Sequence, residues 1–253
     1  MVELTRIVRF HIDGTESPSG LNGYAGRPPV ASLSPMVEAL ITLRGEPDKV
    51  THYVLDIKAF DQWANVHIFP HLKQGFAGDA VQSAMHNAFE AGSHLPHELV
   101  ALELRLTPYA AFKLERDMPT TPLTLTFTQT YDFAAAHHLW ANGADESRNR
   151  ELYGKCAGIH GHNYQLEVVI EPSSTNPIPT ETLDRVVKQH LLDVWDHRVL
   201  NELEDFQVVP PSVERIAQQA AIRLQGPLAA CDLKLREISV SETDRTSARV
   251  RLG

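Results

Sequence analysis

The hydrophobic and polar positions of this chain run through the same series of patterns twice. Alternation between apolar and polar residues predicts strands, and apolar residues three and four apart predict helices. In the first half these patterns predict two strands, two helices and two further strands. The first strands are expected at 4–12 and 36–43 and the last at 98–106 and 111–114. The first helix is expected to start near Ile57, after a short strand at 53–56, and the second to span 78–92. A Gly-, Pro- and Ser-rich loop is expected at 13–34.

The second half repeats the order. Strands and helices are predicted at 123–133, 160–170, 181–200, 212–224, 235–241 and 248–252, with a long polar loop at 141–155. Ser212 is placed to cap the second helix. Identity between the halves is low, so the repetition rests on element order and spacing. The chain is therefore predicted to be an α+β protein with two domains, 1–118 and 121–253, joined by a linker at 118–122.

Composition narrows the classes of protein. The chain has 253 residues, 43% of them hydrophobic, which suits one large or two modest globular domains. A formal net charge of −9 argues against nucleic acid or an anionic membrane as a partner. No apolar run is long enough to cross a bilayer, and the N-terminus has no signal-peptide core. With only Cys156 and Cys231, the chain has no disulfide framework, and we expect a cytoplasmic protein.

A metal site is indicated where the second half begins its second strand. His160 and His162 flank Gly161 in His-Gly-His, and the next residues read as a strand. Side chains alternate along a strand, so both imidazoles point the same way and can hold one ion, usually zinc. A third ligand is sought in the stretch that ends in His137 and His138; on a regular strand these two face opposite ways, and His137 is the better candidate.

Other polar residues of the second half could carry chemistry. Cys156 follows Lys155 in a glycine-containing loop close to the predicted metal, which favours a thiolate; otherwise it is a buried apolar thiol. The Asp196-His197 pair could relay protons or could be ordinary surface residues. Glu242 ends an apolar strand, where a carboxylate could bind the amino-imine edge of a heterocycle or simply be solvated.

Five motifs, in this order, resemble the 6-pyruvoyl-tetrahydropterin synthase family, which includes the bacterial 6-carboxytetrahydropterin synthases. They are FAAAHHL, YGKCAGIHGHNY, WDHRVLN, PSVE and VSETD, and the resemblance covers about 121–253. It implies a zinc ion held by three histidines, a thiol base, an Asp-His pair and a pterin-anchoring glutamate. These roles fall on His137, His160 and His162; on Cys156; on Asp196 and His197; and on Glu242.

The resemblance also implies a fold and a reaction. The family fold, the T-fold, is an antiparallel four-stranded sheet with two helices on one face (ββααββ), and its units assemble into barrels. The reaction expected is a zinc-dependent lyase reaction on the small molecule 7,8-dihydroneopterin triphosphate, with release of triphosphate. Three basic residues are candidates for steering the triphosphate: Arg148, Arg150 and Lys155. The alternative is a non-catalytic pterin- or purine-binding protein with a structural zinc.

The chain combines features of two branches of the family. The gap from Cys156 to His160 resembles the carboxypterin enzymes, whereas the longer loop before Cys156 resembles the pyruvoyl enzymes. The product is therefore either 6-pyruvoyl-tetrahydropterin or 6-carboxytetrahydropterin, and the second would belong to queuosine synthesis. The first half lacks a His-x-His motif and cysteine, so it is interpreted as a degenerate T-fold unit in a homo-oligomer.

Overall fold

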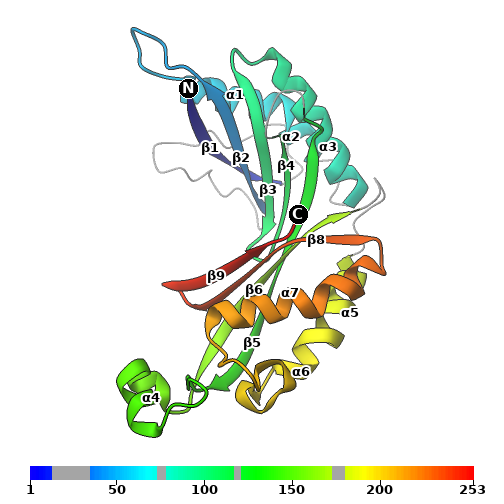
Figure 1. Ribbon diagram of the computed structural model, residues 1–253. Coiled ribbons are helices and arrows are strands. Elements are labelled where there is room, and N and C mark those ends of the chain that lie inside the picture. The colour runs from blue at the N-terminus through cyan, green and yellow to red at the C-terminus, as the bar shows by residue number, and fades with distance from the viewer. Residues whose placement is uncertain (13–34, 73–77, 117–120, 173–179) are drawn as a thin grey trace. The chain divides into compact units, whose positions relative to one another are not determined.

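The protein consists of two compact units. The computed structural model describes the whole chain except residues 13–34, 73–77, 117–120 and 173–179 (Figure 1). Among the described residues, one unit extends to Phe127 and the other begins at Thr128. The loop predicted at 13–34 and most of the predicted linker fall outside the described residues. The metal-free and catalytic roles assigned to the two halves stay predictions.

The sheet of the first unit follows the predicted alternation. Its strands lie in the order β1-β2-β3-β4, and consecutive strands pair antiparallel. Val37, Ala39, Ile41 and Leu43 of the second strand are fully buried, whereas the residues between them are only half-buried. One face of this sheet is therefore the core face. The strands are β1 (Val2–His11), β2 (Met36–Gly45), β3 (Glu98–Thr107) and β4 (Ala110–Glu115).

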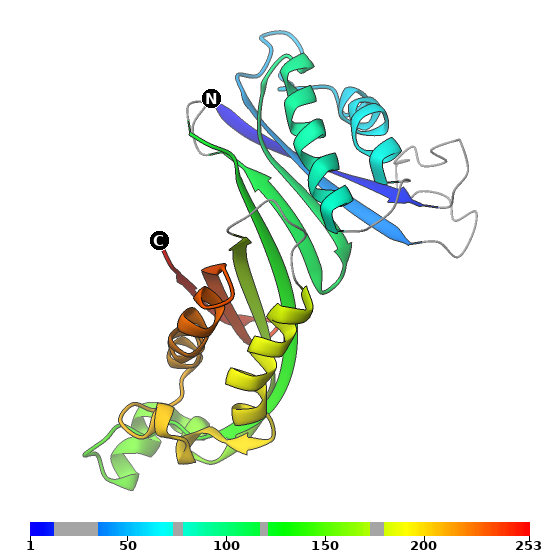
Figure 2. The same ribbon diagram turned by 90° about the vertical axis from the view of Figure 1, so that its right-hand side faces the viewer.

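Helices cover the core face of this sheet (Figure 2). They are α1 (Ile57–His67), α2 (Phe69–Leu72) and α3 (Gly78–Ala91), followed by the 3-10 turn η1 (Gly92–His94). The strand expected at 53–56 does not form; Asp56 instead caps α1 by accepting a hydrogen bond from the Lys58 amide at 2.9 Å. Arg6 of β1 binds buried Asp61 of α1 through two hydrogen bonds of 3.0 Å, which fixes that helix to the sheet.

The sheet of the second unit carries the site. Its strands lie in the order β5-β6-β8-β9, and β8 pairs antiparallel with both neighbours. A two-residue strand, β7, adds to β5 in parallel at Ala135 and Ala136. The bounds are β5 (Thr124–His137), β6 (His160–Pro172), β7 (Arg198–Val199), β8 (Leu233–Thr243) and β9 (Thr246–Arg251).

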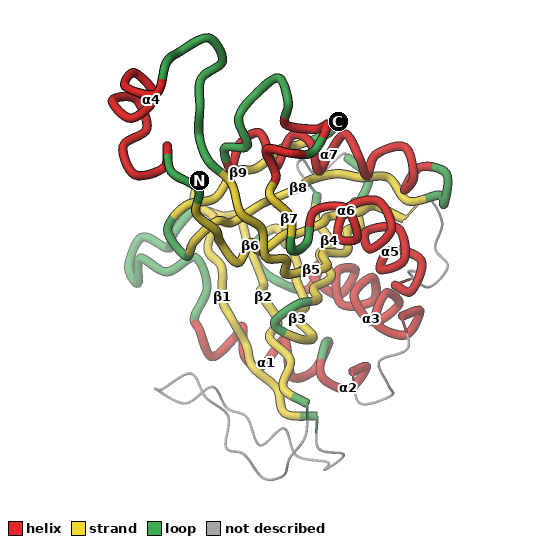
Figure 3. The backbone as a smooth tube through the Cα atoms, turned by 90° about the horizontal axis from the view of Figure 1, so that it is seen from below, coloured by secondary structure: helices red, strands yellow, loops and turns green. Residues whose placement is uncertain are grey.

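The second unit contains more helical segments than the two predicted, and α4 lies apart from the others (Figure 3). Helix α7 packs on β8 and β9, and Ser212 caps it as predicted, accepting from the Arg215 amide at 3.4 Å. The helical segments are α4 (Glu146–Tyr153), α5 (Thr180–Val187), α6 (Asp193–Trp195), α7 (Val213–Ala229), the π-helical turn η3 (Lys188–Leu192) and the 3-10 turns η2 (Gly154–Ala157), η4 (Leu200–Glu202) and η5 (Glu204–Phe206).

Two sequence predictions for this unit were wrong. The helix expected at 181–200 ends at Trp195, because Asp196 turns to an extended conformation and accepts the Ala134 amide of β5. The loop expected at 141–155 contains α4. That helix has no apolar stripe to reveal it; buried Asn149 holds it by bonding to the backbone of the preceding turn.

Aromatic side chains form the core beneath the site-bearing strands. Phe133 of β5 stacks on Tyr164 of β6 with ring centroids 5.0 Å apart, and Trp195 contacts both Phe133 and Phe206. The Trp195 indole also donates to Asp205 at 2.9 Å. Because Trp195 immediately precedes Asp196, this packing fixes where the following residues leave the helix.

The predicted class, α+β with antiparallel strand pairing, is confirmed. None of the helices in the described part of the chain has the length and apolar character needed to cross a membrane.

The first unit should lose stability in mild acid. The pKa of His67 lies below the ordinary value of 6.5, chiefly because the ring is partly buried and then because His94 and His71 repel its charge. Below that value the unfolded chain binds a proton that the folded chain resists, so the free energy of unfolding should fall as pH drops. Denaturant unfolding at about pH 7.5 and about pH 5.5 tests this. His67→Gln should show a smaller drop, and an equal drop in both proteins would contradict the assignment.

Candidate active site

Strands β5 and β6 of the second unit bring three imidazoles together. His137 is the last residue of β5, and His160 and His162 are the first and third residues of β6. The potential ligand atoms of these histidines and of Glu242 all lie within 4.8 Å of one another. His137 is buried, and the other three side chains are half-buried. We call these four residues the histidine-glutamate cluster.

Backbone carbonyls fix the tautomers of two of these histidines. The Nδ1 atom of His137 lies 2.7 Å from the Pro211 carbonyl oxygen, and that of His160 lies 2.8 Å from the Gly158 carbonyl oxygen. A carbonyl oxygen only accepts, so Nδ1 carries the hydrogen and Nε2 carries the lone pair. This is the arrangement that orients metal-bound histidines in proteins.

Two of the remaining ring nitrogens have no hydrogen-bond partner in the described part of the chain. The Nε2 atoms of His137 and His162 are buried and lack a hydrogen bond within the described residues. Burial, the largest influence, lowers the pKa of His137; the bond to the Pro211 carbonyl opposes this and the neighbouring His160 reinforces it. A neutral imidazole with an unused lone pair is what a metal ion requires. The donor set therefore fits a metal ion of the nitrogen-preferring class, such as zinc.

Gly161 lets the two strands approach closely enough to build the cluster. A Cβ atom at this position would lie 3.2 Å from the Ala135 carbonyl oxygen of β5. Only glycine avoids that crowding without a shift of the strands, which explains the residue between the two histidines. His138, the neighbour of His137, lies outside the cluster, in agreement with the alternation expected of a strand.

Glu242 lies beside His162, a position that the sequence did not predict. Its carboxylate oxygen Oε1 is 3.0 Å from Nε2 of His162. The distance is that of a hydrogen bond, but the direction is not, since His162 Nε2 has no hydrogen-bond partner in the described residues. The signal was the β6–β8 register: Leu166 pairs with Val240, so Glu242 reaches the level of the histidines. The proximity of Glu242 to the histidines can be predicted only once the pairing of these two strands is known.

The Asp196-His197 pair is fixed to β5. Asp196 Oδ2 lies 2.9 Å from His197 Nδ1, its Oδ1 accepts the Ala134 amide at 2.9 Å, and the His197 amide donates to the Ala134 carbonyl at 2.6 Å. Partial burial tends to raise the pKa of Asp196, but the bonds from Ala134 and His197 together lower it below its ordinary value. His197 has a φ of 57°, uncommon for a residue other than glycine, and its ring is 81% exposed.

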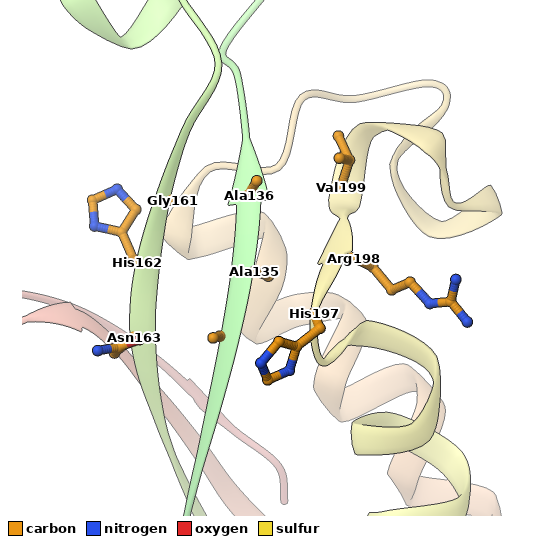
Figure 4. Close-up of a pocket in the computed structure, with 9 residues that line it drawn as sticks. Ala135, Ala136, Gly161, His162, Asn163, His197, Arg198 and Val199 are labelled. Carbon is orange, nitrogen blue, oxygen red and sulfur yellow. The ribbon is translucent and has the colours of Figure 1, made fainter.

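A pocket with a volume of about 470 Å³ is lined by residues of β5, of β6 and of the segment 197–199 (Figure 4). His162 and His197 are both among the residues that line it, from different elements. In Figure 4 the His162 ring points away from β5, on the far side of β6 from His197. In Figure 4 the His197 ring is directed toward β5 and Arg198 extends away from it. The lining residues are Ala134, Ala135, Ala136, Gly161, His162, Asn163, His197, Arg198 and Val199.

Cys156 lies outside both groups. It is half-buried in η2, where its carbonyl accepts the Leu139 amide at 2.8 Å. The thiol is neither in the histidine-glutamate cluster nor among the residues that line the pocket. Two of the three cations considered for triphosphate, Arg148 and Arg150, are bound to glutamates of α4 at 2.7 Å. The structure thus gathers the predicted metal ligands with Glu242, and the predicted thiol base is not part of that cluster.

An α+β unit that turns three imidazoles toward one point defines a candidate metalloprotein. Comparison with known proteins identifies the family to which the chain belongs. The family model described as 6-pyruvoyl tetrahydropterin synthase matches residues 126–252, half of the chain. The chain therefore belongs to the 6-pyruvoyl tetrahydropterin synthase family, a family of pterin-forming enzymes.

Individual relatives agree. The chain is 30% identical over 100 residues to the 6-pyruvoyl tetrahydrobiopterin synthase of Dictyostelium discoideum, a match that covers 37% of this chain and 73% of that protein. It is 31% identical over 100 residues to an Archaeoglobus fulgidus protein named provisionally as a 6-carboxy-5,6,7,8-tetrahydropterin synthase, covering 38% and 79%. Among solved structures, Caenorhabditis elegans 6-pyruvoyl tetrahydropterin synthase matches with 25% identity and a TM-score of 0.46, covering 54% of this chain and all of that one.

We expect the purified protein to carry about one zinc ion per chain, held by the second unit. Removing two of the three imidazoles, in a His160→Ala, His162→Ala double variant, should weaken zinc binding by at least about a hundredfold, since even outer partners of a metal site are worth about ten- to a hundredfold. Metal analysis after dialysis against a chelator measures this. His138→Ala is the matched control and should keep its zinc. Full occupancy in the double variant would refute the site.

Proposed function

We propose that the second unit is a zinc-dependent lyase that releases triphosphate from 7,8-dihydroneopterin triphosphate. The observation that carries this proposal is the convergence of three imidazoles, two with tautomers fixed by backbone carbonyls, in a chain of the 6-pyruvoyl tetrahydropterin synthase family. The product is 6-pyruvoyl-tetrahydropterin or 6-carboxytetrahydropterin, and both kinds of enzyme occur by name among the relatives.

The metal ligands in this proposal are His137, His160 and His162. When bound there, zinc supplies Lewis acidity that makes the side-chain hydroxyls of a substrate more acidic. The three histidines belong to two adjacent strands, so their separation is set by the backbone and not by flexible loops. Rigid placement of this kind is what a site must have to hold one ion in a fixed geometry.

The Asp196-His197 pair serves as a proton-transfer group. The Asp196 carboxylate accepts the Nδ1 hydrogen of His197, which leaves the lone pair of His197 on Nε2. His197 lines the pocket, so a proton on a molecule bound there would lie near its ring. The left-handed backbone of His197 supports a functional role, because such strain persists where surrounding contacts impose it.

Cys156 is the second proton-transfer group, and Glu242 anchors the pterin ring. Both roles follow from the family motifs. Cys156 is half-buried in η2, next to the exposed Lys155. A carboxylate can accept two parallel hydrogen bonds from the amino-imine edge of a pterin, and Glu242 is the half-buried carboxylate at the cluster.

The rival function is pterin or purine binding without turnover, with zinc in a structural role. One observation favours it: three histidines and Glu242 together would make a closed four-ligand shell, which is typical of structural zinc. The Asp196-His197 pair argues the other way, because simple binding does not require an oriented imidazole in the pocket. The proposal also keeps the expected homo-oligomer and cytoplasmic location, which rest on the sequence and the family resemblance.

Incubation of the zinc-loaded protein with 7,8-dihydroneopterin triphosphate decides between these functions. We expect triphosphate to accumulate in step with a new tetrahydropterin, and mass spectrometry of that product distinguishes the 6-pyruvoyl from the 6-carboxy compound. Binding of the substrate without release of triphosphate would favour the rival. Neither binding nor release by folded, zinc-loaded protein would refute the proposal.

Replacing the thiol separates its chemical role from a structural one. Cys156→Ala should lower kcat by roughly a hundred- to ten-thousandfold, the usual contribution of a general acid–base group, while zinc content and the unfolding midpoint stay unchanged. Cys231→Ala is the control, since Cys231 is also half-buried but lies in the turn after α7. Near-normal turnover in Cys156→Ala would remove the thiol from the mechanism, and loss of zinc would make it a ligand instead.

A further inference from the structure

The position of Glu242 is better suited to a metal ligand than to an anchor for a distant ring. In a tetrahedral zinc site with Zn–N distances of about 2.0–2.1 Å, the ligand atoms lie roughly 3.3 Å from one another. Glu242 Oε1 and His162 Nε2 are 3.0 Å apart, close to that spacing. They are not aligned as donor and acceptor, because His162 Nε2 has no hydrogen-bond partner in the described residues. A short separation without donor–acceptor alignment is expected of two atoms that bind the same ion.

Nothing else in the described part of the site holds the carboxylate in place. Its side chain is 19% exposed, and its one ion-pair contact within the described residues is with His162. Tyr164, the nearest buried hydroxyl on β6, has no hydrogen-bond partner there and so does not fix the carboxylate. A half-buried carboxylate is costly unless it is paired or binds a metal, and the imidazoles beside it supply the site for such an ion.

We infer that Glu242 is the fourth ligand of the metal in the substrate-free protein and leaves it when a pterin ring binds. The release of Glu242 on pterin binding rests on the proposed function, whereas its ligation of the metal does not. Bidentate recognition of the amino-imine edge uses both carboxylate oxygens, and metal ligation uses one of them. The two roles therefore compete for the same side chain. The closed four-ligand shell becomes an open three-histidine shell only when the ring takes Glu242 away.

Reciprocity makes this exchange measurable. If ring binding removes a ligand from the metal, a pterin without coordinating side-chain hydroxyls must weaken metal binding, and the metal must weaken binding of that pterin by the same factor. A substrate whose side chain carries hydroxyls replaces the lost ligand. Glu242 is in this way a selectivity device, since it keeps the metal covered until a molecule with the right ring arrives.

The first test uses the full-length protein loaded with cobalt(II) in the absence of any pterin. Glu242→Gln preserves size but removes the anionic ligand, so we expect a changed cobalt d–d absorption spectrum. Metal affinity, measured by competition with a chelator, should fall at least about tenfold, the lower end for partners of a metal site. Glu237→Gln is the matched control on the same strand, because Glu237 pairs with Arg249 and Arg251 and lies outside the cluster. Its spectrum and affinity should equal those of the wild type.

The second test adds a ring without a side chain. Pterin offers the amino-imine edge, whereas lumazine has the same two rings with a carbonyl in place of the amino group. Pterin should shift the cobalt spectrum of the wild type toward that of Glu242→Gln and weaken cobalt binding, and lumazine should do neither. Circular dichroism of each metal-free variant confirms that it is folded before the comparison is made.

The outcomes separate this inference from the proposed function. Wild-type spectrum and affinity in folded Glu242→Gln would overturn ligation by Glu242, whatever the enzyme does. Pterin that binds, by fluorescence quenching, without changing the spectrum would overturn the exchange while leaving pterin recognition intact. Failure of pterin to bind would overturn the exchange, while the result with Glu242→Gln would still decide the ligation and the assay with 7,8-dihydroneopterin triphosphate would separately decide the proposed function.

Discussion

The close approach of β5 and β6 at Gly161 is the constraint on which the site depends. A Cβ atom at this position would lie 3.2 Å from the Ala135 carbonyl oxygen, so a larger residue would require the strands to shift. Because the strands can come together there, His137 at the end of β5 meets His160 and His162 at the start of β6. The same stretch of β5 also carries Ala134, whose amide and carbonyl hold Asp196 and His197. A few residues of one strand thus position both the candidate metal ligands and the candidate proton-transfer pair.

The sequence was most informative where one strand or helix could be read alone. Alternation predicted the faces of β2 and β6, and His-Gly-His predicted two imidazoles on one face. Contacts made by distant residues were not readable. Helix α4 depends on Asn149 bonding to the backbone, and the end of α6 depends on a hydrogen bond between Asp196 and β5. Glu242 joined the cluster through the register of β6 with β8, which a linear pattern does not contain.

The site residues differ in how firmly the chain holds them. The imidazoles lie on paired strands, and His137 and His160 donate to backbone carbonyls, whereas Cys156 occupies a short turn whose carbonyl accepts the Leu139 amide. The residues that would hold an ion are thus built into the sheet, and the residue that would move a proton sits on a connection. This division agrees with the general placement of reactive groups on loops that a rigid scaffold supports.

The hydrogen bond from His137 to the Pro211 carbonyl has a consequence for how the molecule is assembled. Pro211 immediately precedes the cap of α7, so the acceptor is in place only after that helix has docked on β8 and β9. Before docking, His137 has no carbonyl to choose between its two nitrogens. The complete set of oriented imidazoles therefore exists only when the helix is in place on the sheet, so an ion bound by that set stabilises the docked helix.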